Sequence, residues 1–172
     1  MIGDLLSNLA QAQKLDIASI QKAVQDGTLP AYVGIPLIQQ KMQERKEAEK
    51  KEVEIINADY LKFQEQDGKK FTRLVGNVAL KQEDILMWCD SANLDKETNT
   101  VDAWGRVHIQ QDTINAYSNM LHHDGNRKFS VLTGNARITD SRMILYTEEL
   151  FYDVKNKTAY YLNHGRVIKD SS

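Results

Sequence analysis

The chain has 172 residues, a formal net charge of −2 and a hydrophobic content of 41%, which indicates one ordinary domain, or one domain with an appendage. This charge excludes the basic patch typical of a nucleic-acid-binding protein, and no apolar run approaches the roughly 18–20 residues of a transmembrane helix. The single cysteine, Cys89, excludes an internal disulfide, and its place in the apolar run 85–89 predicts core packing.

Residues 1–52 are predicted to be helical, because they are rich in Gln, Lys, Glu and Ala. They begin without a basic flank before an apolar segment, so no signal peptide is predicted. We expect two or three helices, the first of them over residues 2–9. This segment is predicted to be a module separate from residues 53–172, either native to that part or grafted onto it.

Within the N-terminal segment, Asp16 is predicted to cap a helix that Gly27 ends. Pro30 and Pro36 predict a turn or an extended connector over residues 28–36, followed by another helix over residues 37–52. The last turns of this helix are almost wholly charged. We interpret them as a solvated helix with ion pairs between residues four apart, and a partner-binding helix is the alternative.

From Val53 onward, apolar and polar residues alternate, which is typical of half-buried strands. Short polar turns separate the strands, and one of them, Asp67-Gly68, is a strong hairpin signal. No helical pattern interrupts the series, so we expect an antiparallel or meandering sheet. The strands are predicted over residues 53–63, 71–81, 85–94, 100–110, 113–121, 129–139, 143–152 and 158–168.

A glycine recurs in every second strand. Gly76, Gly105, Gly134 and Gly165 are 29, 29 and 31 residues apart (105 − 76, 134 − 105 and 165 − 134). A fixed period in this range indicates a repeat architecture, here of four units. Because glycine weakens a strand, its recurrence predicts a bend of the backbone or the close approach of another chain segment.

One face of the glycine-containing strands is apolar, at the positions two before, two after and four after the glycine. A single hairpin cannot bury such a face, so the repeats are predicted to stack around an apolar interior. In the fourth unit two of these positions hold Asn163 and Lys169, so we expect the interior to close or fray there. The predicted inward-facing residues are Leu74, Val78, Leu80, Ala103, Val107, Ile109, Leu132, Ala136 and Ile138.

The repeat motifs in residues 74–78, 87–94 and 97–107 resemble those of the OstA-like family, with a Gly-Asn-Val strand, then a strand with Asp-x-Ala-x-Leu, then a turn before Thr100. The resemblance covers residues 53–170 and is closest to the Bacteroidetes type of the family. This family includes the LptA-type periplasmic bridge and the N-terminal part of the outer-membrane protein LptD.

This resemblance implies a mainly β fold, in which a repeat-built antiparallel sheet folds over as a β-jellyroll or β-taco behind the helical N-terminal segment. It also implies a periplasmic lipid carrier in lipopolysaccharide transport, which binds lipopolysaccharide or lipid A acyl chains in an apolar groove. The nine inward-facing residues would line that groove. The implied partners are other OstA-like domains, copies of the same chain included, which pair through their edge strands.

No catalytic arrangement is found, so neither an enzyme nor a cofactor is predicted. His122 and His123 are interpreted as solvated turn residues rather than metal ligands, and His108 and His164 as exposed residues. Acidic residues recur in the strands that lie between the glycine-containing strands, and we interpret them as residues that favour strand ends and turns. These are Asp59, Asp90 and Glu148.

Two functions therefore fit the sequence. The first is the lipid carrier, which needs apolar area rather than reactive groups, because burial contributes about 0.8 kcal/mol per methylene. The alternative is a structural assembly module with a filled interior, which polymerises or docks through its sheet edges without a lipid ligand. A repeat-type carbohydrate enzyme is a third interpretation, which the absence of clustered acids disfavours.

Overall fold

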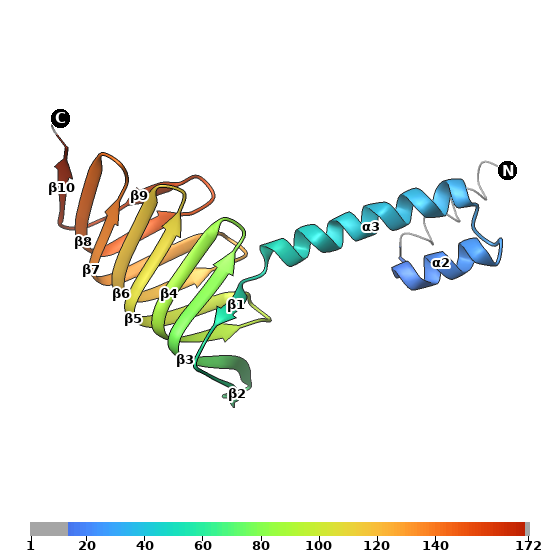
Figure 1. Cartoon of the computed structure of the whole chain (residues 1–172), viewed down its shortest axis with the longest axis horizontal. Coiled ribbons are helices and arrows are strands. Elements are labelled where there is room, and N and C mark those ends of the chain that lie inside the picture. The colour runs from blue at the N-terminus through green and yellow to red at the C-terminus, as the bar shows by residue number, and fades with distance from the viewer. Residues whose placement is uncertain (1–13, 171–172) are drawn as a thin grey trace. The chain divides into compact units, whose positions relative to one another are not determined.

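The computed structural model describes residues 14–170 of the chain. The chain divides into two compact units, Met1–Glu49 and Lys50–Ser172, of which the first contains the helices and the second the sheet. Helix α2 spans Ile17–Gln25 and helix α3 spans Ala31–Lys51. The helix expected over residues 2–9 lies outside the described residues. A mainly β chain with helices at its N-terminus confirms the predicted fold class (Figure 1).

Helix α2 begins and ends where the sequence predicts. The Asp16 carboxylate accepts a hydrogen bond from the backbone N–H of Ser19 at 2.7 Å, which satisfies a free donor of the first helical turn. Hydrogen bonding from the Ser19 side chain, and to a smaller extent from its backbone N–H, lowers the pKa of Asp16. Gly27 follows the helix with a φ of 77°, the left-handed conformation that commonly ends a helix.

Helix α3 corrects the prediction of a connector over residues 28–36, because it begins at Ala31 and continues through Pro36. A proline inside a helix removes one backbone hydrogen bond. Close packing offsets this loss, since Leu37 is buried with Ile20 in a small apolar core. The two helices approach so closely that a Cβ on Gly34 would lie 2.2 Å from Val24 Cγ2.

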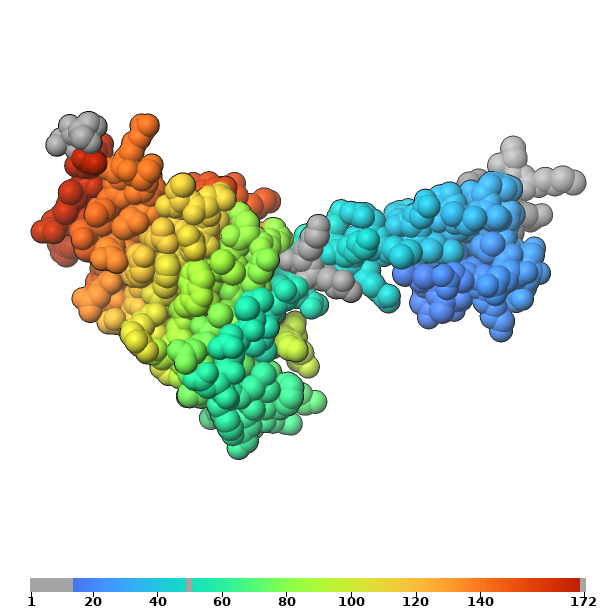
Figure 2. All heavy atoms as spheres, viewed as in Figure 1, coloured from blue at the N-terminus to red at the C-terminus, as the bar shows by residue number. Residues whose placement is uncertain are grey.

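The second unit is one antiparallel sheet of ten strands in the order β1-β3-β4-β5-β6-β7-β8-β10, with β2 paired to β3 and β9 paired to β8. From β2 to β9 the strands follow one another as hairpins, so neighbours in sequence are neighbours in space, whereas β1 pairs with β3 and β10 with β8 (Figures 1 and 2). The strands are β1 (Glu54–Asn57), β2 (Tyr60–Gln66), β3 (Lys69–Gln82), β4 (Ile85–Asp95), β5 (Thr100–Gln111), β6 (Ile114–Asp124), β7 (Phe129–Thr139), β8 (Met143–Asp153), β9 (Thr158–Tyr160) and β10 (Gly165–Lys169).

The recurrent glycines make the bulges that fold the sheet. Strands β3, β5 and β7 each contain two successive residues with positive φ, of which the first is Gly76, Gly105 or Gly134, and the pairing register shifts at each of them. Two residues then face one on the neighbouring strand, which bends the strand sharply. The long strands bend over on themselves at these points (Figure 1).

A side chain of the preceding strand closes over each of these glycines. At Gly105, a Cβ would lie 2.5 Å from Asp90 Oδ2, and the same position is held by Asp59 at Gly76 and by Asn119 at Gly134. Asp90 also pairs with Arg106, the other bulge residue, at 2.6 Å. The bend and the close approach predicted from the sequence are therefore both found at Gly76, Gly105 and Gly134. The interpretation of the acids as strand-end and turn residues is wrong for Asp90 and Glu148, which lie inside β4 and β8.

Replacing Gly105 with alanine is expected to destabilise the sheet by roughly 2–3 kcal/mol, because the change adds a clash with Asp90 to the cost of a positive φ. Gly68→Ala is the matched control, since Gly68 has a φ of 77° and no atom within 4 Å of the added Cβ. Urea unfolding followed by tryptophan fluorescence measures the sheet alone, because Trp88 and Trp104 are the only tryptophans. Equal losses in the two variants would contradict the close-approach argument.

Two strand predictions need correction at the ends of the sheet. The run expected over residues 53–63 is split into β1 and β2, which pair with different parts of β3 on either side of its bulge. The run expected over residues 158–168 is split into β9 and β10, which pair with different parts of β8. Gly165 does not adopt a positive φ, so the fourth unit lacks the bulge of the first three.

The apolar face of the repeats forms the core. Eight of the nine residues predicted to face inward are at most 3% exposed, and the ninth, Ile138, is partly buried against them. Cys89 is buried in the same cluster, as predicted, and burial raises its pKa to about 12. The interior between the folded halves of the sheet is therefore filled by side chains along most of its length.

Candidate functional site

The two rows of hairpin turns meet along the open side of the folded sheet. One row contains turns 83–84, 112–113 and 140–142, and the other contains turns 96–99, 125–128 and 154–157. Polar side chains join the two rows across the mouth of the apolar interior. We call this line of contacts the seam, and each group of contacts around one amide side chain a rung.

The central rung is built on Gln82. Its Nε2 donates to the carbonyl oxygens of Lys51 at 2.6 Å and Gly125 at 2.8 Å, and its Oε1 lies 2.7 Å from Nε2 of His123. The other ring nitrogen of His123 lies 2.8 Å from the hydroxyl of Ser130. A salt bridge of 2.8 Å between Lys128 and Glu83 covers this rung from outside.

His123 corrects the prediction of a solvated turn residue, because it is fully buried. Burial lowers the pKa of His123 to about 4, with a smaller opposing effect from Asp124. The neutral ring suits its partners, since one nitrogen donates to the amide oxygen of Gln82 while the other accepts from Ser130. His122 is exposed, as predicted, and lies 2.6 Å from the Asp102 carboxylate.

The next rung repeats this arrangement 29 residues later along the chain (111 − 82 and 152 − 123). Gln111 replaces Gln82, and the buried phenol of Tyr152 replaces the imidazole and donates to the amide oxygen of Gln111. Gln111 Nε2 donates to the carbonyl oxygen of Val154 and to Asp84, both at 3.1 Å. Burial and nearby carboxylates raise the pKa of Tyr152 to about 12, so it stays a donor.

The ends of the seam differ. At the N-terminal end, Asn99 accepts from the backbone N–H of Val53 at 3.0 Å and donates to the carbonyl oxygen of Lys51 at 2.9 Å, so this end is closed. At the C-terminal end, the residue equivalent to Gln82 and Gln111 is Asp140 (111 + 29). Its carboxylate caps its own turn, accepting from the N–H groups of Arg142 and Met143, and forms no rung among the described residues.

An apolar pocket of about 430 Å³ lies at this C-terminal end, where the seam has no rung. We call it the end pocket. It continues the core, because Ile114, Ile138 and Leu145 both line the pocket and pack against the buried cluster. Lys157 and Asp140 stand among the apolar lining. The other lining residues are Thr139, Met143, Tyr152, Ala159, Tyr160, Tyr161 and Val167.

The nine residues proposed from the sequence as a lipid groove are brought together, but only Ile138 lines the end pocket. The other eight are buried in the packed interior, and their contact with lipid stays a prediction. Leu145 and Val167 were not among those nine residues. Leu145 lies in β8, which contains none of the recurrent glycines, and Val167, two residues after Gly165, belongs to the fourth unit, where the interior was expected to close or fray. Extending the same alternation to β8 and β10 identifies both residues.

The remaining candidates from the sequence do not form a reactive site. His108 is partly buried rather than exposed, because its ring stacks between those of Trp88 and Tyr117. His164 is exposed. Among the side chains that the structure describes, those of residues 14–48 and 51–170, no three His, Cys, Asp or Glu are grouped as a metal site would require. None of the helices within residues 14–170 combines the length and the apolar character needed to cross a bilayer.

Comparison with known proteins agrees with the fold. The crystal structure of LptH from Pseudomonas aeruginosa, described as the LptA-homologous periplasmic component of the lipopolysaccharide transport device, superposes with a TM-score of 0.58 at 14% sequence identity. The match covers 70% of this chain and 94% of LptH, so it shows a shared fold. A search of curated proteins found no match. The model of the OstA-like protein family matches residues 50–172, which contain the whole sheet, and the chain therefore belongs to the OstA-like family.

Proposed function

We propose that the protein is a non-enzymatic carrier module of lipopolysaccharide transport, which acts in the periplasm and holds lipid A acyl chains at the open, C-terminal end of the apolar interior of its folded sheet. The observation that carries this proposal is the end pocket, an apolar opening that continues into the core. Its volume lies within the range of about 300–1,000 Å³ that is usual for small-ligand sites. Family membership and the fold shared with LptH agree with this function.

The chemistry of the site is suited to transport rather than reaction. Burying an acyl chain of a dozen methylenes contributes on the order of 10 kcal/mol, at about 0.8 kcal/mol per methylene. Such a ligand needs apolar surface, which Ile114, Ile138, Leu145 and Val167 offer in the end pocket. Because the two amide rungs close the side of the fold, the acyl chain would enter at the C-terminal end.

The same end presents an edge for a partner. Strand β10 is exposed along its whole length and pairs with β8 on one side only. At the opposite end of the sheet, strand β2 is also exposed throughout. Edge strands carry unpaired backbone groups that can add a strand from another molecule. We propose that a second OstA-like module, either another protein or a copy of this chain, pairs there and continues the apolar interior.

A point variant in the end pocket tests lipid binding. Val167→Asp places a carboxylate in the apolar lining and is expected to weaken the binding of a fluorescent lipid A analogue by about tenfold or more. Ile168→Asp is the matched control, because Ile168 is the next residue of β10 and does not line the pocket. The two residues are similarly exposed, Val167 at 47% and Ile168 at 42%. The affinity of this control variant should stay within about twofold of the unmodified protein.

Binding is measured by fluorescence anisotropy, with tryptophan fluorescence as the check that both variants fold. Saturable binding that Val167→Asp weakens and Ile168→Asp does not would support the carrier. Absence of saturable binding would exclude it and leave the assembly module, in which the filled interior serves only to hold the edges in place. An equal loss of affinity in both variants would show that the lipid binds somewhere other than the end pocket.

A further inference from the structure

A second pocket of about 640 Å³ lies on the outer face of the sheet, opposite to the end pocket. We call it the outer pocket. Successive residues of a strand point to opposite faces, and the two pockets use such pairs: Arg137 beside Ile138, Tyr146 beside Leu145 and Arg166 beside Val167. The outer pocket is thus a separate site with different chemistry.

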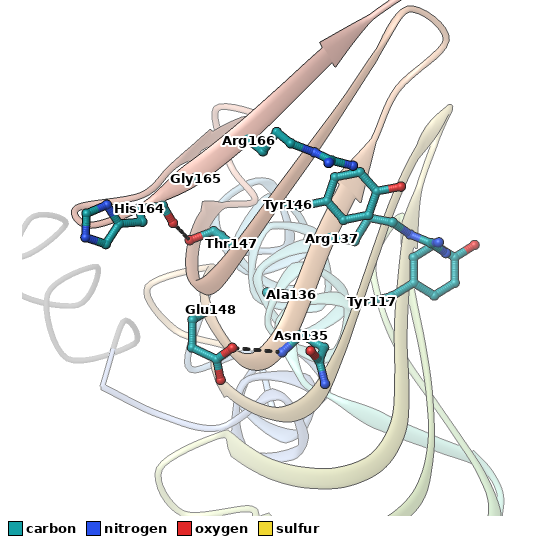
Figure 3. Close-up of a pocket in the computed structure, with 10 residues that line it drawn as sticks. All are labelled: Tyr117, Asn135, Ala136, Arg137, Tyr146, Thr147, Glu148, His164, Gly165 and Arg166. Atoms are coloured by element: carbon teal, nitrogen blue, oxygen red, sulfur yellow. Dashed lines mark hydrogen bonds between the residues drawn. The ribbon is translucent and has the colours of Figure 1, made fainter.

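Two arginines and two tyrosines alternate across four neighbouring strands in this pocket. Tyr117 of β6, Arg137 of β7, Tyr146 of β8 and Arg166 of β10 are paired in register. The Arg137 guanidinium lies 4.4 Å from the centre of the Tyr117 ring, and that of Arg166 lies 5.3 Å from the Tyr146 ring. Figure 3 shows the ends of all four side chains on the same side of the pocket.

Neither arginine has a carboxylate partner in the part of the chain that the structure describes. Elsewhere in the sheet, Arg106 pairs with Asp90 at 2.6 Å, and Arg73, which also stacks on a ring, donates to Asn93 at 3.1 Å. In contrast, Arg137 Nε is buried without a hydrogen-bond partner. Protein atoms cover this donor, so an anion would bind at the Nη groups of the same guanidinium, where it would offset part of the cost of holding the charged side chain without an acceptor.

Stacking leaves the guanidinium edges available. A guanidinium that lies over a ring uses its flat face for the ring, while its N–H groups point outward in its own plane. The hydroxyls of Tyr117 and Tyr146 also make no hydrogen bond with any described residue, so they extend this row of donors. One carboxylate lines the pocket, Glu148, which accepts from the backbone N–H of Asn135 at 3.4 Å and lies away from the guanidiniums (Figure 3).

We propose that the outer pocket binds a ligand that carries two phosphate groups, one at each arginine. Arg137 and Arg166 stand two strands apart, which corresponds to roughly 10 Å at about 4.8 Å per strand. This separation exceeds the span of one phosphate and fits an extended ligand such as a doubly phosphorylated sugar, either free or as a lipid headgroup. The inference rests on the outer face alone and does not require lipid in the end pocket.

Isothermal titration calorimetry at fixed ionic strength tests the proposal with inorganic phosphate and with glucose 1,6-bisphosphate. The bisphosphate is expected to bind about tenfold more tightly or better, because it engages both guanidiniums. Arg166→Gln should weaken bisphosphate binding about tenfold, while Arg166→Lys keeps the charge and should lose part of that affinity. Arg127→Gln, in an exposed turn away from the pocket, removes the same charge and should leave affinity within about twofold.

The outcomes separate this inference from the proposed function. No saturable binding of the bisphosphate, equal affinity for the two anions, or equal losses in the Arg166 and Arg127 variants would each overturn it. Because Arg166 is exposed, its replacement is not expected to impair folding, and Arg137→Gln is the second variant. Anionic vesicles carrying the headgroup show whether a membrane-bound phosphate is also recognised. A negative result with the bisphosphate would not alter the result with the fluorescent lipid A analogue, because the lipid experiment measures binding at the end pocket on the inner face.

Discussion

Acidification from pH 7 to pH 4 is expected to destabilise the sheet by up to about 3 kcal/mol through His123 alone, because its pKa is about 4 in the fold against 6.5 in the unfolded chain. The unfolded chain binds the proton first, so stability falls as the pH drops through 6.5 and levels off below 4. Protonation would place a charge in the buried rung and replace the acceptor that faces Ser130 with a second donor. Urea unfolding at several pH values, followed by tryptophan fluorescence, measures this loss.

Two variants test whether His123 causes the loss of stability on acidification. His123→Gln removes the titrating group, so the loss of stability between pH 7 and pH 4 should shrink even if the variant is less stable at both. His122→Gln changes only the exposed neighbour and is the matched control for the loss of an imidazole. The carboxylates of the sheet unit whose pKa values lie below the ordinary value, Asp90, Asp140 and Asp153, act mainly below pH 4, outside this window. An unchanged slope in His123→Gln would contradict the assignment.

Replacing Gln111 with leucine is expected to cost roughly 2–5 kcal/mol, because the change leaves the buried hydroxyl of Tyr152 and the carbonyl oxygen of Val154 without their partner. Gln110→Leu is the matched control, since Gln110 is the next residue, is only partly buried and makes no contact across the seam. Its effect should stay within about 0.5 kcal/mol. Unfolding in urea measures both variants.

A double-mutant cycle separates the rung from general packing. Tyr152→Phe alone leaves the amide oxygen of Gln111 unpaired and should cost about 1–2 kcal/mol, while Gln111→Leu with Tyr152→Phe should cost clearly less than the sum of the two single changes. Additive losses would show that the two side chains do not act together. If the seam also limits access to the interior, the Gln111 variant should exchange the fluorescent lipid A analogue faster than the unmodified protein.

The seam explains how a sheet with free edges keeps an apolar interior closed to water. Each amide side chain reaches from one row of turns to a backbone carbonyl in the other, and the buried ring behind it completes the hydrogen bonding. Buried polar groups stabilise a structure only when all their partners are present. The contacts therefore hold the two halves in one register and leave the C-terminal end as the opening.

Much of the architecture follows from local pattern. The alternation of apolar and polar residues depends only on the strand period, so it correctly identified the inward face, including Leu74, Val107 and Leu132. The recurrence of Gly76, Gly105 and Gly134 likewise predicted the bends, because few other residues adopt that backbone conformation. These properties belong to single strands and to their immediate neighbours.

The sequence predictions that were wrong concerned features that depend on contacts between residues distant in the chain. His123 looks like a turn residue in sequence, but β6 continues to Asp124 and buries His123 on its inner face, where Gln82, 41 positions earlier, meets it across the fold. Pro36 looks like a helix breaker and is tolerated because its helix packs on α2. The alternation alone could not show that eight of the nine inward residues fill the interior and that the opening lies beside Leu145 and Val167.

The sequence by itself thus determined the period, the strands and the side of each strand that avoids water, because these follow from short-range sterics and hydrophobicity. Only the tertiary structure decided which polar groups become buried, where the seam stops and which arginines remain unpaired. The buried polar groups and the seam arise where the two rows of turns meet, between residues 40 or more positions apart, as in the 43 between Gln82 and Gly125. The free arginines follow from which side chains the sheet register places beside them.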